Sequence, residues 1–196
     1  MLLEGSLGNF HFGEHNVILY SSISELRQLL IEYCRISFKS SNEILLILTY
    51  YNSIENILKT LKDIDNKSES RQIDGSLVIR ESAKVYFNLA DELVDIMIMI
   101  RMLLQRKRKL GKDGLTVILD MGIFFHRKRI VDLISHETNL SLGSTDDNEV
   151  RMICCYGTTD LTLLTQQQKQ QILGTHDKSS RILKDIKRFM PRQHGG

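Results

Sequence analysis

The chain has 196 residues, of which 42% are hydrophobic, so it can bury one substantial core but is too short for two full α/β domains. Its formal net charge of +2 gives no indication of a general polyanion binder, and we expect no nucleic acid partner. Three cysteines, without a Cys-x-x-Cys pair or the density of a disulfide scaffold, are typical of a reducing cytoplasm. No apolar run reaches the roughly 18 to 20 residues that span a bilayer, and the N-terminus lacks the basic region of a signal peptide. We therefore expect a cytoplasmic protein without a membrane partner.

The first third of the chain contains two predicted strand–helix pairs. Residues 17–20 form a short apolar run, and the sequence Ser-Ile-Ser-Glu at 22–25 is a capping box that predicts the start of a helix. Residues 44–48 are apolar at every position, which is typical of a strand covered by helices on both faces of a parallel sheet. A second helix is predicted after residue 52, because apolar side chains then recur at intervals of three and four. A polar loop is expected over 63–74.

The alternation continues through the rest of the chain. Residues 77–79 predict a third, weaker strand. Residues 88–109 predict a long helix whose last turn is basic, where positive charge suits the negative end of the helix dipole. Two more buried strands are predicted at 115–119 and 150–156, with a helix at 124–136 between them. A final capping box is predicted at 165–168.

Five strand signals that alternate with helices predict the fold class. We expect a three-layer α/β fold with a mainly parallel sheet of five, or slightly more, strands. One domain is expected over residues 1–182, followed by a basic tail over 183–196.

The sequence lacks a phosphate-binding loop. The turn after the first strand, residues 20–24, contains no glycine, and the pattern G-x-x-x-x-G-K-[ST] is absent from the chain. The strand at 115–119 ends at Asp120, as strands do in nucleotide hydrolases, but aspartate also caps the turn after a strand, and we favour that interpretation. ATP hydrolysis is therefore not expected. A degenerate RecA-like nucleotide-binding protein or ATPase is kept as an alternative.

Motifs for metal binding and nucleophilic catalysis are weak. His11 and His15 are four residues apart, but a strand begins between them, so no helix aims both rings at one ion. The His-Glu pair at 136–137 lacks the second histidine of a zinc-protease helix. Cys154 could pair with His176, yet a cysteine inside an apolar strand is typically a small core residue. The sequence thus predicts no metal site, no cofactor and no catalytic residue.

Five short segments carry a resemblance to a known family. They are Gly13-Glu14-His15 with Leu19-Tyr20, Asp113-Gly114-Leu115 to Asp120, His136-Glu137, Ile153-Cys154-Cys155-Tyr156, and Ile172-Leu173-Gly174-Thr175-His176. Together they resemble the MEDS domain, the methanogen/methylotroph sensory domain family, over residues 13 to 182. The resemblance implies a RecA/KaiC-like α/β domain without a phosphate loop, of a kind found in signalling proteins and transcriptional regulators and thought to sense small organic compounds. The family's motif residues fall on His15, Tyr20, Glu137, Cys154, Tyr156 and His176.

The geometry of parallel strands predicts two polar clusters at opposite ends of the strands. Ligands bind outside the carboxyl ends of strands in open α/β sheets, so we expect a small organic molecule at Tyr20, Ser21, Tyr50, Asp120, Cys154 and Tyr156. Glu137 and His176, each at a helix end, are expected near His15 at the start of the first strand. We interpret this second cluster as a hydrogen-bonded lock. The alternative is a proton-sensitive or partner-facing site, because histidine beside a carboxylate titrates near neutrality.

The leading functional hypothesis is a non-enzymatic sensory and signalling domain. It would bind a small organic molecule and act through a signalling partner protein or as a homodimer. An enzyme would instead need Asp120 or Cys154 in an open cleft with an acid or base in reach. A protein-interaction module without a ligand would expose the apolar flank of the helix at 97–102 and would have no pocket.

Overall fold

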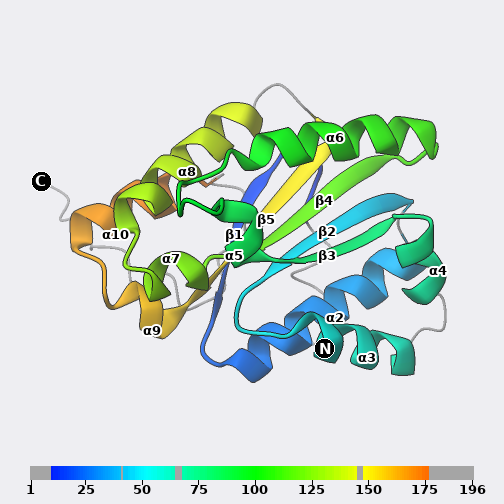
Figure 1. The fold of residues 1–196 in the computed structure, drawn as a ribbon, viewed down its shortest axis with the longest axis horizontal. Coiled ribbons are helices and arrows are strands. Elements are labelled where there is room, and N and C mark those ends of the chain that lie inside the picture. The colour runs from blue at the N-terminus through cyan, green and yellow to red at the C-terminus, as the bar shows by residue number, and fades with distance from the viewer. Residues whose placement is uncertain (1–9, 41, 65–67, 145–147, 177–196) are drawn as a thin grey trace, which may run out of the picture.

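The computed structural model describes residues 10–40, 42–64, 68–144 and 148–176, and the protein there is an α/β fold with one five-stranded sheet (Figure 1). Every pair of neighbouring strands is parallel. The strands, in their order across the sheet, are β1 (His15–Tyr20), β5 (Val150–Gly157), β4 (Gly114–Asp120), β2 (Glu43–Thr49) and β3 (Leu77–Glu81). Helices flank both faces, so the predicted three-layer class is confirmed. The predicted basic tail over 183–196 lies outside the described residues.

The helices form one layer on each face of the sheet. We call the face covered by α6 (Ile96–Lys109), α8 (Ile130–Ser144) and α10 (Gln166–Gly174) the α8 face. The opposite face, covered by α2 (Ile23–Ser40) and α3 (Ile54–Ile64), is the α2 face. The remaining short helices are α4 (Ser68–Ile73), α5 (Ser82–Tyr86), α7 (Gly122–His126) and α9 (Thr158–Leu161).

Strand alternation decides which layer each side chain joins. Val17 and Leu19 pack into the core of the α8 face, whereas Ile18 and Tyr20 pack into the core of the α2 face. The three central strands are buried at nearly every position, as expected for a sheet covered on both sides.

The long helix predicted over 88–109 begins only at Ile96. The Asn88 side chain accepts hydrogen bonds from the backbone N–H groups of Ala90 and Glu92, both at 2.9 Å, and so folds residues 88–92 into a turn. Asp95 then caps the helix by accepting from the backbone N–H of Met97. Local side-chain bonds therefore replace the first two turns of the predicted helix.

Two other boundaries also differ from the prediction. The helix predicted over 124–136 is divided into α7 and α8, because Lys128 adopts a left-handed backbone conformation (φ 54°) between them. The loop predicted over 63–74 contains α4. Capping hydrogen bonds form at both predicted capping boxes. Glu25 N–H donates to Ser22 Oγ at 3.1 Å, and the box at Thr165 and Gln168 is complete.

Among the described residues, no helix combines the length and the apolar character that a membrane crossing requires.

Candidate functional site

Asp120, at the carboxyl end of β4, has its hydrogen bonds already satisfied. Its carboxylate accepts from the backbone N–H groups of Tyr50, Tyr51 and Gly122 at 2.9, 3.0 and 3.1 Å, and Tyr20 Oη lies 3.5 Å away. Only 1% of Asp120 is exposed, and this burial raises the pKa of its carboxyl. Asp120 thus ties the end of β2 to the end of β4. At this edge, Tyr50 is half-buried and Ser21 is exposed.

In the turn after β1, the polar groups of Ser21 donate hydrogen bonds to a carboxylate of the same chain, that of Glu25. Glu25, on the first turn of α2, accepts from the backbone N–H of Ser21 at 2.7 Å and from its hydroxyl at 2.6 Å. A phosphate-binding loop would present such donors to a phosphate oxygen. The negatively charged Glu25 carboxylate therefore occupies the donors that a nucleotide phosphate would need.

The structure does not bring Cys154 and Tyr156 together with Tyr20 and Asp120, although all four were expected at one site. Cys154 and Tyr156 pack in the core of the α8 face, whereas Tyr20 packs in the core of the α2 face. The reason is the pleat: Leu19, not Tyr20, is in register with Tyr156 and shares its face.

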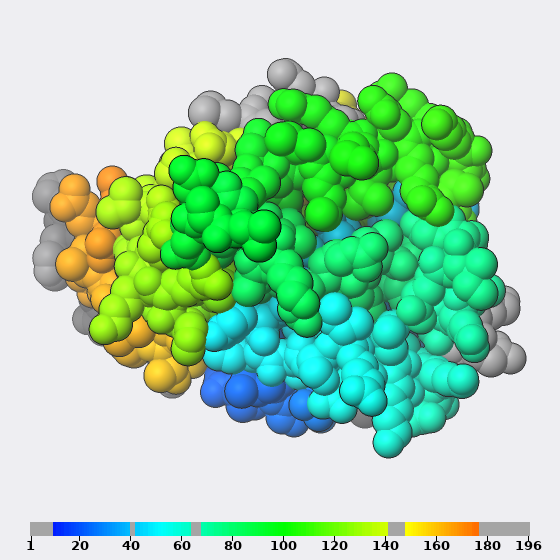
Figure 2. Space-filling view, in the orientation of Figure 1, coloured from blue at the N-terminus to red at the C-terminus, as the bar shows by residue number. Residues whose placement is uncertain are grey.

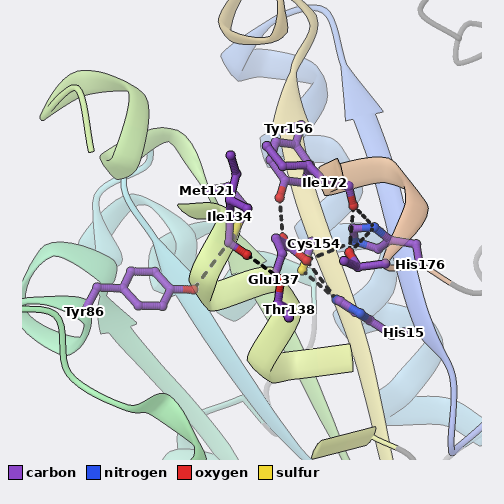
Figure 3. A network of polar contacts seen from close by, with 11 residues as sticks. His15, Tyr86, Met121, Ile134, Glu137, Thr138, Cys154, Tyr156, Ile172 and His176 are labelled. Atoms are coloured by element: carbon purple, nitrogen blue, oxygen red, sulfur yellow. Dashed lines mark hydrogen bonds and ion pairs between the residues drawn. The ribbon is translucent and has the colours of Figure 1, made fainter. Parts of the chain in front are cut away.

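Four side chains meet on the α8 face, one each from β1, α8 and β5 and one from the residues just after α10 (Figure 3). We call His15, Glu137, Cys154 and His176 the histidine cluster. His15 Nε2 lies 3.2 Å from Cys154 Sγ and 3.3 Å from Glu137 Oε2, and His176 Nε2 lies 3.5 Å from the same carboxylate oxygen. The two imidazole rings have their centroids 4.2 Å apart. The proximity of His15, Glu137 and His176 expected from the topology is therefore present, and Cys154 joins them.

Burial shifts the pKa values of Glu137, Cys154 and His176 toward the uncharged form. Desolvation raises the pKa of Glu137 to about 7, although the hydrogen bond from Tyr156 opposes the shift. Burial, and next the charge of Glu137, raise the pKa of the Cys154 thiol well above its ordinary value. Burial, and next the neighbouring His15, lower the pKa of His176. As built, the cluster favours a neutral thiol and a neutral His176.

Two further contacts orient the cluster. His176 Nδ1 lies 2.9 Å from the backbone carbonyl of Ile172, so this nitrogen carries the proton and Nε2 presents its lone pair to the cluster. Tyr156 Oη donates a hydrogen bond to Glu137 Oε1, which leaves Oε2 facing both histidines (Figure 3). Tyr156 thus acts on the histidine cluster rather than at the carboxyl edge.

A small pocket lies beside His136, the residue that precedes Glu137 on α8. It has a volume of about 140 Å³ and lies between residues 93–97, which lead into α6, and His136, Asn139 and Leu140 of α8. We call it the His136 pocket. Leu93, Val94, Ile96, Met97 and Leu140 supply its apolar walls.

His136 is the polar side chain buried in the wall of this pocket. Only 4% of the residue is exposed, and its ring stacks on Phe124 and meets the edge of Tyr86, with centroids 5.5 and 4.9 Å away. Burial lowers the pKa of His136 to about 3. Its Nε2 is buried and has no hydrogen-bond partner among the described residues. In the sequence, the His-Glu pair at 136–137 indicates only an incomplete metal motif, which does not point to a ligand pocket. The available signal was the place of His136 on the apolar stripe of α8.

A larger apolar hollow lies at the edge of the sheet. Figure 2 shows it between α6 and β3, and it measures about 350 Å³. Ile98 and Met102, which are 55% and 66% exposed, lie along it. The apolar flank of α6 is therefore exposed, as the interaction-module alternative requires. That alternative also expects no pocket, whereas the structure has this hollow and the His136 pocket.

Comparison with known proteins identifies the family. The model described as "MEthanogen/methylotroph, DcmR Sensory domain", MEDS, matches residues 14–177, a range that includes the whole histidine cluster and the His136 pocket. No curated protein matches the chain. The match confirms the resemblance seen in the sequence and gives the chain a sensory role. The chain belongs to the MEDS family of sensory domains.

Proposed function

We propose that this MEDS domain is a non-enzymatic sensor that binds a small organic molecule in the His136 pocket and signals through a partner protein or a second copy of itself. One observation carries the proposal. A histidine that is almost fully buried presents an unpartnered ring nitrogen beside a small, mostly apolar pocket. Buried polar atoms without partners are rare in folded proteins, and a ligand that bonds to the nitrogen would account for this one.

The pocket limits the size and chemistry of its ligand. An apolar cavity of about 150 Å³ is large enough for benzene. A pocket of about 140 Å³ therefore suits a compound of that size. The apolar walls favour a hydrocarbon body, and His136 Nε2 favours one hydroxyl or carbonyl group. The ligand class is thus a small, uncharged organic compound with a hydrogen-bonding group for His136.

Ligand binding would act on the segment that leads into α6. Residues 93–97 form one wall of the pocket, and the segment before them is held by an isolated bridge between Phe87 and Leu93. A ligand bonded to His136 would draw this segment toward α8. The movement would reach Ile98 and Met102, whose exposed side chains offer a surface to a partner.

The carboxyl-edge site of Tyr20, Ser21, Tyr50 and Asp120 stays a prediction. A ligand there would have to compete with three backbone N–H groups for Asp120. The interaction-module alternative is favoured by a separate observation, the exposed apolar hollow beside Ile98 and Met102. A nucleotide-binding function has less support, because Glu25 occupies the donors of the first turn.

Phenol and benzene form a matched pair of probes for the His136 pocket. They share a ring, and only phenol carries a hydroxyl that can bond to Nε2. A neutral hydrogen bond contributes about 1 kcal/mol, so phenol should bind roughly fivefold more tightly than benzene. Ligand-observed NMR titration of the purified chain measures both affinities.

Two variants complete this test. His136→Phe keeps the ring that stacks on Phe124 but removes both nitrogens, so it should bind phenol and benzene equally. His11→Phe, a substitution of an exposed histidine, should leave the preference for phenol intact. Absence of binding of either probe to the folded wild-type chain, or an unchanged preference in His136→Phe, would refute the proposal.

A further inference from the structure

The histidine cluster brings together four atoms of the kinds that bind transition metals. These are Nε2 of His15 and His176, Sγ of Cys154 and Oε2 of Glu137, and all lie within 4.8 Å of one another. Three of the separations are 3.2, 3.3 and 3.5 Å. Around a tetrahedral zinc ion, with bonds of about 2.0 to 2.3 Å, ligand atoms lie about 3.3 to 3.7 Å apart. The cluster is therefore close to the spacing that a tetrahedral ion would need.

We propose that His15, Glu137, Cys154 and His176 bind a divalent transition-metal ion of the zinc class. Two imidazoles and a thiolate favour such an ion over Mg²⁺ or Ca²⁺, which prefer sites built of oxygen atoms. On binding, the Cys154 thiol, and Glu137 where it is protonated, release their protons to solvent, and the ion binds the resulting thiolate and carboxylate. This site is independent of a ligand in the His136 pocket and extends the function proposed above.

The groups around the cluster fit a metal site. A histidine ligand usually donates its other N–H to a carbonyl or carboxylate, which fixes the tautomer and the orientation of the ring. His176 makes this contact with the carbonyl of Ile172. The carboxylate ligand is held in the same way, because Tyr156 donates to its second oxygen. The two ligands thus present the correct atoms without rearrangement.

An ion would also resolve the polar atoms left in the cluster. The exposed fractions of the four residues are between 0% and 7%. His176 Nε2 and Glu137 Oε2 make no hydrogen bond with the described part of the chain. Buried ionisable groups are costly unless they are paired or bound to a metal. In the hydrogen-bonded lock expected from the sequence, these two atoms meet only in an ion-pair contact of 3.5 Å, whereas an ion would coordinate both.

Closure of the site depends on α10. His176 lies just after this helix, which packs mainly against α8. Because all four ligands are buried, an ion can reach them only while His176 and α10 are displaced. Metal binding and the docking of α10 are therefore coupled.

Cobalt binding tests the proposal directly. The untagged chain is treated with a chelator, checked by circular dichroism for its fold, and titrated with Co²⁺. We expect one Co²⁺ per chain, visible bands of a tetrahedral ion, and the near-ultraviolet charge-transfer band of a thiolate bound to cobalt. Zn²⁺ should displace the Co²⁺ and abolish all of these bands.

Adjacent cysteines provide the control. Cys154→Ala should abolish the thiolate band, whereas Cys155→Ala should keep it. Cys155 is as deeply buried as Cys154, but its side chain packs on the α2 face. If Cys154→Ala does not fold, His176→Ala, which changes a residue at the end of a helix, should lower the Co²⁺ affinity at least tenfold. A folded wild-type chain that binds no Co²⁺, or a thiolate band that survives in Cys154→Ala, would overturn the metal site in favour of the hydrogen-bonded lock.

Discussion

Lys107 shows how a single buried charge depends on its partner. Its side chain is only 7% exposed, and its ammonium lies 2.8 Å from a Glu149 carboxylate oxygen. This hydrogen bond holds the pKa of Glu149 below its ordinary value, although desolvation opposes the shift and the charge of Lys107 adds to it. A carboxyl whose pKa is lowered by folding adds stability above its unfolded pKa of about 4.3, and this stability is lost as the pH falls through the folded pKa.

Glu149→Gln should therefore lower the free energy of unfolding by about 1 kcal/mol at pH 7, a modest value because Glu149 is 40% exposed and screened by solvent. The difference from wild type should shrink below about pH 4, as the wild-type carboxyl becomes protonated. Urea denaturation at pH 7 and at pH 3.5 measures both effects. Glu81→Gln, which breaks the exposed pair with Lys84, should change the stability by less than about 0.5 kcal/mol at either pH. An equal loss in both variants would contradict the argument from burial.

The candidate residues were predictable to different degrees. His15, Glu137 and His176 were expected together, because parallel topology returns helix ends to the start of β1, and the structure places them in contact. Glu137, however, lies inside α8 and not at the helix end where it was expected, because α8 continues to Ser144. Cys154 was expected at the carboxyl end of its strand, in the ligand site, but it contacts His15 in the histidine cluster. The sequence gives the position of a residue along a strand. It does not give the helix side chains that the residue meets in the adjacent layer, because these depend on where the helices pack.

At the scale of elements, strands were easier to predict than helices. Residues 44–48 are apolar throughout and residues 115–119 are apolar except at Thr116, and both runs lie within central strands. The apolar spacing over 88–109 is equally regular, yet its first part is not helical. The Asn88 side chain bonds to backbone N–H groups that a helix would have used. Such local competition depends on side-chain geometry, which periodicity does not report.

The helix α10 is short, Gln166–Gly174, so its N-terminal cap should matter. Thr165 Oγ1 accepts from the backbone N–H of Gln168 at 3.2 Å, and the Gln168 side chain accepts from the N–H of Thr165 at 2.9 Å. Loss of such a cap costs about 1 kcal/mol. Thr165→Ala should therefore speed amide hydrogen exchange in α10 about fivefold, while the exchange of β4 stays unchanged.

The same variant probes the coupling between α10 and the metal site. If docking of α10 closes the site, Thr165→Ala should weaken Co²⁺ binding by about the same fivefold factor. Thr138→Ala is the matched control, because the exposed Thr138 hydroxyl bonds only within α8, to the carbonyl of Ile134. It should change neither the exchange of α10 nor the Co²⁺ affinity. Faster exchange in α10 with unaltered Co²⁺ binding would show that the ion does not require a docked α10.

At the scale of the whole molecule, one sheet serves two cores. Adjacent residues of β4 divide between them, since Ile118 belongs to the α2 face and Leu119 to the α8 face, and both are fully buried. Neither core can persist without the strands that it shares with the other. We therefore expect the two layers to unfold in one cooperative transition, as in a single domain.

The cysteines report on each layer separately. Cys34 packs on the α2 face and Cys154 on the α8 face, and both thiols are buried. In the metal-free chain, labelling with a thiol reagent at increasing urea should expose both at the same midpoint. Leu119→Ala removes contacts only on the α8 face and should cost about 2 to 5 kcal/mol. Because the sheet is shared, it should shift the midpoints of Cys34 and Cys154 equally. A variant in which Cys154 reacts at lower urea than Cys34 would show that the α8 layer, which carries both proposed sites, can open while the rest stays folded.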